Sequence, residues 1–391
     1  MQLGSRKNLV VCQKSKVQDW VNHFKEHYNF YQDKILVFDL TDKEDFEYFF
    51  TSKIPDHKYI GVINYDILFR RKILLNLTDF TLMLDESSLI QNSTAKRTKI
   101  ILKMKPSNII LLSGTPTSGK YENLWTQLHL LGWDISQDIY NKQYVNWTLT
   151  KDDGSGIRHK IVDKKNPYKN VDRLKDKLRE HGAIFMKSEE CFDLPEQTFI
   201  TVNYGSTKEY AEFKKDSIVR IGDIELIGDT TLTKRLYSRM LCGQYNQEKL
   251  DGFEDLVQST NDRLIVFYNF NEELNQLKKI AKNLNRPISE VNGHTKDLTA
   301  YENEGNSVTF VQYQSGAKGL NLQKSNRIIY FTPTEKCEDW MQSQKRIHRI
   351  GQKKPCFYYQ MICKNSVEEQ IYDALQRGVD FTDDLFVKGD K

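Results

Sequence analysis

Short apolar runs alternate with stretches of helical spacing in the first part of the chain. The run Leu9–Cys12 is followed by Val17, Trp20, Val21 and Phe24, a spacing that predicts a helix after a strand. Further apolar runs stand at 35–38, 60–64, 80–84 and 108–112. Strands that alternate with helices in this way predict an α/β fold with a parallel sheet covered by helices.

The same alternation resumes after residue 263. Apolar runs there stand at 264–267, 288–291, 308–311, 328–331 and 357–362. In between, polar stretches such as 151–159 and 163–170 bury little apolar surface, although Thr231–Cys242 has a helical pattern. We therefore predict a first lobe at residues 1–133, a partly helical insertion and inter-lobe region at 134–256, and a second lobe at 257–391.

Composition limits the class of protein. A chain of 391 residues with 39% hydrophobic content can form two or three domains. No stretch approaches the roughly 18 consecutive apolar residues of a membrane span, and the N-terminus lacks the pattern of a secretion signal. The net charge of +4 is too small to indicate nucleic acid by itself, so local clusters have to carry that argument. The six cysteines form no CxxC pair, which argues against a zinc site or a disulfide framework.

An acidic pair follows one of the buried runs. Asp85 and Glu86 come directly after Phe80–Leu84, at the carboxyl end of a strand, where open α/β sheets place ligands. A carboxylate at this point can hold Mg²⁺ through its waters, and the next acid can orient or deprotonate an attacking water. An isolated Asp-Glu pair in this position is also typical of a simple cap on the next turn.

A turn of small hydroxyl residues follows the neighbouring run. Ser113, Gly114 and Thr115 come after 108–112 and precede the amphipathic stretch 124–131. This turn can be part of a functional site or the capped start of a helix, and both interpretations can hold at once.

The letters GTPTSGK at Gly114–Lys120 satisfy the G-x-x-x-x-G-K spacing of a phosphate-binding loop. However, Tyr121 stands where a serine or threonine should bind Mg²⁺, and Pro116 removes one backbone N–H from the loop. We therefore interpret the Gly-Lys pair as coincidental and Lys120 as a solvated lysine.

Two arginines mark the second lobe. Arg346 and Arg349 are three residues apart in a helix predicted over Glu335–Arg349, so they would share one face and point at one ligand. Guanidinium groups give planar, permanently charged recognition of phosphate. A basic helix is more often only a solvated face.

Ser315–Leu322, SGAKGLNL, follows the run 308–311. Its two glycines suit a close approach of the backbone to a phosphate chain. A simple turn would explain the glycines as well.

Taken together, DESS at Asp85–Ser88, SGT at Ser113–Thr115 and QSQKRIHRIGQ at Gln342–Gln352 resemble the Swi/Snf-type helicase-like ATPases of helicase superfamily two, which are similar to DEAD/DEAH-box proteins. The resemblance covers Leu9 to about Leu375, and the compact form is similar to bacterial and phage members. It implies two RecA-like lobes, each with a parallel sheet.

The resemblance also implies roles for the marked residues. Asp85 would take the metal role and Glu86 the water role, while Arg349 would be an arginine finger with Arg346 as its companion. Coupling of hydrolysis to movement would involve Ser113, Gly114, Thr115 and Gln342. Contacts to DNA would involve Ser315, Lys318, Gly319 and Asn321.

By the same resemblance, the protein would be a motor that uses ATP and Mg²⁺ to move on double-stranded DNA without reading its sequence. Its other partners would be replication or repair proteins rather than a membrane. Its location would be the cytoplasm of a bacterial or phage-infected cell.

One departure from the family changes this expectation. The family opens with a Gly-Lys-Thr phosphate loop (Walker A) upstream of the strand that matches Leu9–Cys12, and only eight residues precede that strand here. We therefore predict weak or absent ATP hydrolysis by this polypeptide alone, as in a truncated reading frame, one half of a split motor or an experimentally shortened chain. The alternatives are a non-catalytic DNA-binding or interaction module, and an active ATPase that uses Gly119 and Lys120 as its phosphate loop.

Overall fold

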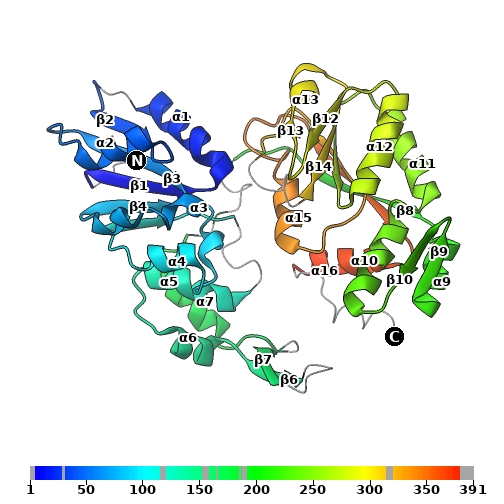
Figure 1. The fold of residues 1–391 in the computed structure, drawn as a ribbon, viewed down its shortest axis with the longest axis horizontal. Coiled ribbons are helices and arrows are strands. Elements are labelled where there is room, and N and C mark those ends of the chain that lie inside the picture. The colour runs from blue at the N-terminus through cyan, green and yellow to red at the C-terminus, as the bar shows by residue number, and fades with distance from the viewer. Residues whose placement is uncertain are drawn as a thin grey trace. The chain divides into compact units, whose positions relative to one another are not determined.

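The computed structural model describes residues 5–28, 31–114, 120–151, 158–163, 166–184, 186, 192–313 and 320–378. The chain forms two compact units, residues 1–185 and 186–391. In each unit, helices cover a parallel sheet (Figure 1). The predicted α/β class, with two lobes built on helix-covered parallel sheets, is confirmed.

The first unit is built on a five-stranded sheet in the order β2-β3-β1-β4-β5, in which every pair of neighbours is parallel. The strands are β1 Lys7–Cys12, β2 Ile35–Asp39, β3 Lys58–Asn64, β4 Phe80–Leu84 and β5 Asn108–Leu111. The central strands β1 and β4 are almost wholly buried, which is why most of their residues are apolar.

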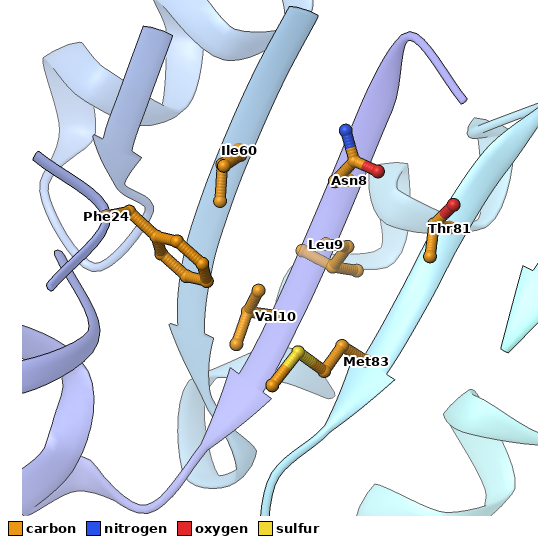
Figure 2. A pocket seen from close by; sticks show the side chains of 7 residues that line it. All are labelled: Asn8, Leu9, Val10, Phe24, Ile60, Thr81 and Met83. Atoms are coloured by element: carbon orange, nitrogen blue, oxygen red, sulfur yellow. The ribbon is translucent and has the colours of Figure 1, made fainter. Parts of the chain in front are cut away.

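Helices pack on both faces of this sheet. One face carries α1 (Val17–His27), whose Val17, Val21 and Phe24 are buried against Val10 of β1. A small apolar cavity remains there between α1 and the strands, too narrow for a ligand (Figure 2). The other face is covered by α2 (Lys43–Thr51), α3 (Tyr65–Leu68) and α4 (Lys96–Ile101), with the 3₁₀ turns η1 (Lys14–Lys16), η2 (Lys72–Asn76) and η3 (Ser87–Ile90) between elements.

A smaller helical region completes the first unit. It consists of η4 (Tyr121–Leu124), α5 (Trp125–Leu130), α6 (Gln137–Tyr144) and α7 (Val171–Glu180), together with the two-stranded ribbon β6 (Trp147–Lys151) and β7 (Arg158–Val162). These helices have a hydrophobic cluster of their own, which consists of Leu124, Leu128, Tyr140, Tyr144, Leu174 and Leu178.

The second unit is built on a seven-stranded sheet in the order β13-β12-β14-β11-β15-β16-β8. All pairs are parallel except β12 with β13. The strands are β8 Gln197–Tyr204, β11 Leu264–Tyr268, β12 Ile288–Val291, β13 Lys296–Asp297, β14 Val308–Gln312, β15 Arg327–Tyr330 and β16 Cys356–Cys363.

Two helical layers cover the second sheet. One face packs against α11 (Gln247–Gln258) and α12 (Asn271–Asn283), and the other packs against α10 (Thr231–Cys242), α15 (Cys337–Gln344) and α16 (Val367–Gln376). The remaining elements are α9 (Lys208–Asp216), α13 (Thr299–Asn303) and the ribbon β9 (Ile218–Ile221) with β10 (Ile224–Ile227). The helix predicted at Thr231–Cys242 has those bounds in the structure.

Residues 134–256, grouped by sequence as one inter-lobe region, are divided between the two units. The helices and ribbon up to residue 184 belong to the first unit, whereas β8 pairs with β16 along its whole length. The five described cysteines are free and buried, and no helix in the described ranges is long and apolar enough to cross a membrane.

Gly252 of α11 packs against Tyr204 of β8, so a substitution at Gly252 tests how tightly α11 packs on the sheet. A Cβ atom there would lie 2.3 Å from the Tyr204 ring and hydroxyl. We expect Gly252→Ala to lower the free energy of unfolding by about 1–3 kcal/mol through overpacking, although alanine in a helix is otherwise preferred by about 1 kcal/mol. Gly305→Ala is the control, because an added Cβ there meets no atom within 4 Å. Equal stability of the two variants in urea denaturation would contradict this packing.

Candidate functional site

The acidic pair stands at the carboxyl edge of the first sheet, as its position after an apolar run predicts. All five residues of β4 are buried, while Asp85 and Glu86 are partly exposed. The backbone N–H of Asp85 donates to Val11 O at 2.9 Å, so the hydrogen bonding with β1 continues one residue past the strand. The first carboxylate is therefore held by a rigid central strand.

Asp85 is oriented by two aromatic residues. The indole N–H of Trp20 in α1 donates to Asp85 Oδ2 at 2.9 Å, and the Tyr65 hydroxyl donates to the Asp85 carbonyl oxygen at 3.0 Å. The other carboxylate oxygen, Oδ1, accepts no hydrogen bond from the described residues. The fold therefore holds Oδ2 in place through Trp20, whereas no described residue donates a hydrogen bond to Oδ1.

Burial sets the charge state of the groups beside Asp85. Burial first, and the Asp85 carboxylate second, raise the pKa of the Cys12 thiol to about 12. The same two causes, in the same order, raise the pKa of Tyr65 well above its ordinary value. Both groups therefore stay neutral at physiological pH.

Glu86 has a left-handed backbone, with φ 55° and ψ 58°. This conformation costs a residue with a side chain about 1–2 kcal/mol, so the surrounding contacts have to hold it. Glu86 Oε1 accepts hydrogen bonds from the hydroxyls of Ser88, at 2.9 Å, and Ser113, at 3.2 Å. The structure thus brings together the acidic pair and the turn after β5, which the sequence places on neighbouring strands.

The serine after the pair ties this edge to the helical region. The Ser87 backbone N–H donates to Leu112 O at 2.7 Å, and its buried hydroxyl donates to Gln127 Oε1 in α5 at 2.9 Å. Both serines of DESS therefore have definite hydrogen-bond partners.

Sequence reasoning did not identify Trp20, Tyr65 or Gln127 as site residues. Tyr65 could have been found, because it follows β3 at the same edge of the sheet as the acidic pair. Trp20 lies 65 positions from Asp85, and only the tertiary structure relates them.

The structure describes only the two ends of the phosphate-loop candidate Gly114–Lys120. Residues 115–119, including Thr115 and Gly119, lie outside the described residues. Gly114 and Lys120 on either side of them are exposed.

The predicted helix over Glu335–Arg349 is wrong at its C-terminal end. Helix α15 ends at Gln344, so neither Arg346 nor Arg349 lies on it. The physical reason is a change of hydrogen-bond partners after Gln344: the Arg346 N–H donates to Ser343 O at 3.1 Å, and Gln342 O, which a continuing helix would pair with that N–H, accepts from the Arg346 guanidinium at 3.0 Å. His348 Nε2 lies 2.9 Å from the carbonyl oxygen of Pro195.

The two arginines consequently have different surroundings. The Arg346 guanidinium donates to the carbonyl oxygens of Gln342 and Leu320, both at 3.0 Å. Its own carbonyl oxygen accepts from the Leu322 N–H at 3.1 Å. Arg349 is exposed, and its side chain has no hydrogen-bond or ion-pair partner among the described residues. In the described part of the second unit, the Arg346 and Arg349 guanidinium groups therefore do not form a pair that faces one ligand.

Two of the remaining second-unit candidates, Gln342 and Asn321, lie among the described residues. Gln342 is buried and donates to Glu338 Oε1 at 3.0 Å. Asn321 is exposed between the buried Leu320 and Leu322. Ser315, Lys318 and Gly319 lie outside the described residues.

A polar cluster lies at the carboxyl edge of the second sheet. Asn269, which follows β11, donates to the carbonyl oxygens of Thr332 and Pro333 in the segment after β15. Arg239 of α10 packs over the Phe270 ring and forms an ion pair with Glu335 at 3.1 Å. These contacts join three segments that are far apart in the chain.

Two family models match this chain, and together they span most of it. The SNF2-related domain matches residues 2–249, and the helicase conserved C-terminal domain matches residues 248–351.

Curated relatives are similar at low identity. The chain is 22% identical over 94% of its length to the mouse (Mus musculus) SWI/SNF-related matrix-associated actin-dependent regulator of chromatin subfamily A member 1. It is 23% identical over 76% of its length to the putative ATP-dependent helicase/translocase YwqA of Bacillus subtilis. The chain spans 37% and 34% of these two relatives, respectively.

Among solved structures, the chain is similar to the Sulfolobus solfataricus SWI2/SNF2 ATPase core in complex with dsDNA. The identity is 18%, the TM-score is 0.39, and the match covers 95% of this chain and 80% of that one. The SNF2-related match alone covers more than half of the chain and includes the acidic pair and the serine turn, and the second match includes Gln342–Gly351. The chain therefore belongs to the SNF2-related domain family and carries the helicase conserved C-terminal domain after it.

Proposed function

We propose that this chain is the motor part of an ATP-hydrolysing translocase that moves along double-stranded DNA. The observation that carries the proposal is the acidic pair at the end of the buried strand β4, with Glu86 held in a left-handed conformation by Ser88 and Ser113. The name of the Bacillus subtilis relative, an ATP-dependent helicase/translocase, supports ATP as the fuel and movement as the output.

The oxygen donors at this edge are of the kind that Mg²⁺ prefers. Asp85 would hold the ion through its waters, since Trp20 fixes one carboxylate oxygen and the other accepts nothing from the described residues. A bound Mg²⁺ would neutralise charge that develops on the phosphates. Glu86 would orient the attacking water or accept its proton, and Ser113, Gly114 and Thr115 would couple hydrolysis to movement.

In the second unit, Arg349 would supply the guanidinium that stabilises charge on the transferred phosphoryl group. Its exposure and its lack of a partner among the described residues support this role. Arg346 would act indirectly, by fixing the end of α15 and the segment at Leu320. Gln342 would belong to the coupling group.

Duplex DNA would be bound through its backbone, without base readout. The resemblance of residues 315–322 to a family motif supports contacts from Ser315, Lys318, Gly319 and Asn321. The name of the mouse relative, a regulator of chromatin, supports DNA as the track.

We further propose that turnover by this polypeptide alone is weak. In the printed sequence, G-x-x-x-x-G-K occurs once, at Gly114–Lys120, and the hydroxyl that should follow it is replaced by Tyr121. Lys120 would then have no part in nucleotide binding.

The test is phosphate release from ATP, with and without duplex DNA, for the wild-type chain, Glu86→Gln and Lys120→Ala. We expect weak, DNA-stimulated turnover in the wild type, a loss of at least about 100-fold in Glu86→Gln, and no change in Lys120→Ala. Glu47→Gln is the matched control, because Glu47 is an exposed acid of α2. Loss on Lys120→Ala would instead support an improvised phosphate loop.

A second candidate is a non-catalytic DNA-binding or interaction module, or one half of a split ATPase. It is favoured by the same missing Gly-Lys-Ser/Thr sequence. Retained DNA binding with no phosphate release by the wild type would support it and would overturn the proposal of a motor that is active alone.

A further inference from the structure

The ribbon β6–β7 belongs to none of the family motifs discussed above. Its two antiparallel strands form a separate sheet, which pairs with no other strand of the described residues. Figure 1 shows it beside α6 and α7, extending away from the sheet of the first unit. A two-stranded ribbon is at best marginally stable by itself, so its base has to be anchored.

The anchor is a network of backbone and side-chain hydrogen bonds. The Asn146 N–H donates to Pro167 O at 2.9 Å, and the Asp163 N–H donates to Asn146 O at 2.8 Å. Tyr168 forms a bridge with Val145, and its hydroxyl donates to Glu122 Oε2 at 2.7 Å. The ribbon is therefore held firmly by the helical region and can present its side chains in a defined arrangement.

The strand register decides which side chains share a face. Trp147 pairs with Val162 and Leu149 pairs with Lys160, so these four residues lie on one face together with Arg158. Lys160 Nζ lies 5.1 Å from the centroid of the Trp147 ring, and Leu149 is exposed. This face combines the cations Arg158 and Lys160 with exposed apolar surface.

The segment around the ribbon is basic. Residues 147–184 contain ten lysines and arginines and six acids, a surplus of four, whereas the whole chain of 391 residues has a net charge of +4. The acids of α7 are paired with cations of the same helix: Asp172 with Lys175, Asp176 with Arg179, and Glu180 with Lys177. Arg158 and Lys160 are exposed and have no carboxylate partner among the described residues.

We propose that this face of β6–β7 binds the phosphate backbone of duplex DNA as a contact separate from the family motifs. The inference rests on the proposed function, since it requires DNA as the partner. Arg158 can meet a phosphate in bidentate fashion, and Lys160, already held against the Trp147 ring, loses less side-chain freedom when it binds. Contacts of this kind position a protein on DNA without reading its sequence.

Basic residues on a ribbon can also serve only to prevent aggregation along its open edges. That role predicts a loss of solubility on neutralisation and no change in DNA affinity. The two explanations therefore separate in a binding experiment.

The experiment measures binding of the full chain to a short fluorescent duplex by anisotropy, without nucleotide, between about 50 and 200 mM salt. We expect Arg158→Ala/Lys160→Ala to weaken binding at least ten-fold at low salt. The slope of log affinity against log salt should become shallower by about 2, since each lost phosphate contact contributes about 0.9. Lys160→Glu alone should also weaken binding and serves if the double variant folds poorly. The control is Lys208→Ala/Lys215→Ala, which removes two exposed cations from α9.

The outcomes distinguish the two levels of the proposal. A double variant that is folded and keeps the wild-type affinity and salt slope overturns the ribbon contact and leaves DNA binding by the chain intact. A wild-type chain that does not bind duplex DNA overturns both. An equal loss in the α9 control would attribute the effect to net charge and would also overturn the ribbon contact.

Discussion

Lys249→Met is expected to lower the free energy of unfolding of the second unit by about 3–5 kcal/mol. Lys249 Nζ lies 2.7 and 2.8 Å from the two carboxylate oxygens of Glu368, and neither side chain has any exposed surface. Removal of the lysine alone leaves a buried carboxylate without its cation. Burial lowers the pKa of Lys249, but Glu368 and the nearby thiols outweigh this effect and raise the pKa above its ordinary value.

The upward shift of the Lys249 pKa decides at which pH the ion pair contributes to stability. A lysine whose pKa is raised by folding contributes its stability below the unfolded pKa of about 10.4, and the contribution is lost as pH rises through the folded pKa. Burial also raises the pKa of Glu368, and Lys249→Met removes the cation that opposes this rise. The destabilisation by Lys249→Met should therefore grow as pH increases above the unfolded carboxyl pKa of about 4.3.

The double variant Lys249→Met/Glu368→Gln should recover much of the lost stability, because it removes both charges and keeps an acceptor for the Cys363 N–H. The measurement is urea denaturation followed by fluorescence. Lys324→Met is the control: its ion pair with Glu302 is about half exposed, and such pairs contribute no more than about 1 kcal/mol. Equal effects of Lys249→Met and Lys324→Met would show that the buried pair is not the stabilising feature inferred here.

Arg349→Ala should reduce DNA-stimulated ATP turnover by about 1,000-fold or more, the usual effect of removing an arginine finger. The same change should leave the free energy of unfolding unaltered, because Arg349 is exposed and has no partner in the described ranges. Turnover is measured under the DNA conditions that give the wild type its highest rate, and stability by thermal unfolding. Wild-type turnover in Arg349→Ala would exclude the finger role.

Arg346→Ala provides the matched comparison. Its guanidinium bonds the carbonyl oxygens of Gln342 and Leu320, so its loss should cost about 1–3 kcal/mol of stability, a typical value for hydrogen bonds to a charged group. Arg346→Lys should recover part of that stability. If Arg346→Ala and Arg349→Ala had the same stability and the same turnover, the inference that the two arginines have different roles would be wrong.

The strands could be predicted well because their signal is local. The run Phe80–Leu84 is apolar except for Thr81 and corresponds to β4 with the same bounds. The helix Thr231–Cys242 was equally clear, because its residues repeat with helical spacing. In contrast, the residues of β8 are mostly exposed or half-buried, so they form no apolar run. This segment is a strand because it pairs with β16, some 160 positions away.

The sequence by itself determined the order of the α/β elements, the position of Asp85 and Glu86 at the end of a buried strand, and the family resemblance. These properties follow from periodicity and spacing over a few residues, which the backbone geometry of strands and helices imposes locally. Only the tertiary structure decided that Trp20 holds Asp85, that Glu86 is left-handed, and that Arg346 turns inward while Arg349 stays exposed. Those outcomes depend on burial and on hydrogen bonds between distant segments, such as the one from the Arg346 guanidinium to the Leu320 carbonyl oxygen, which no local pattern encodes.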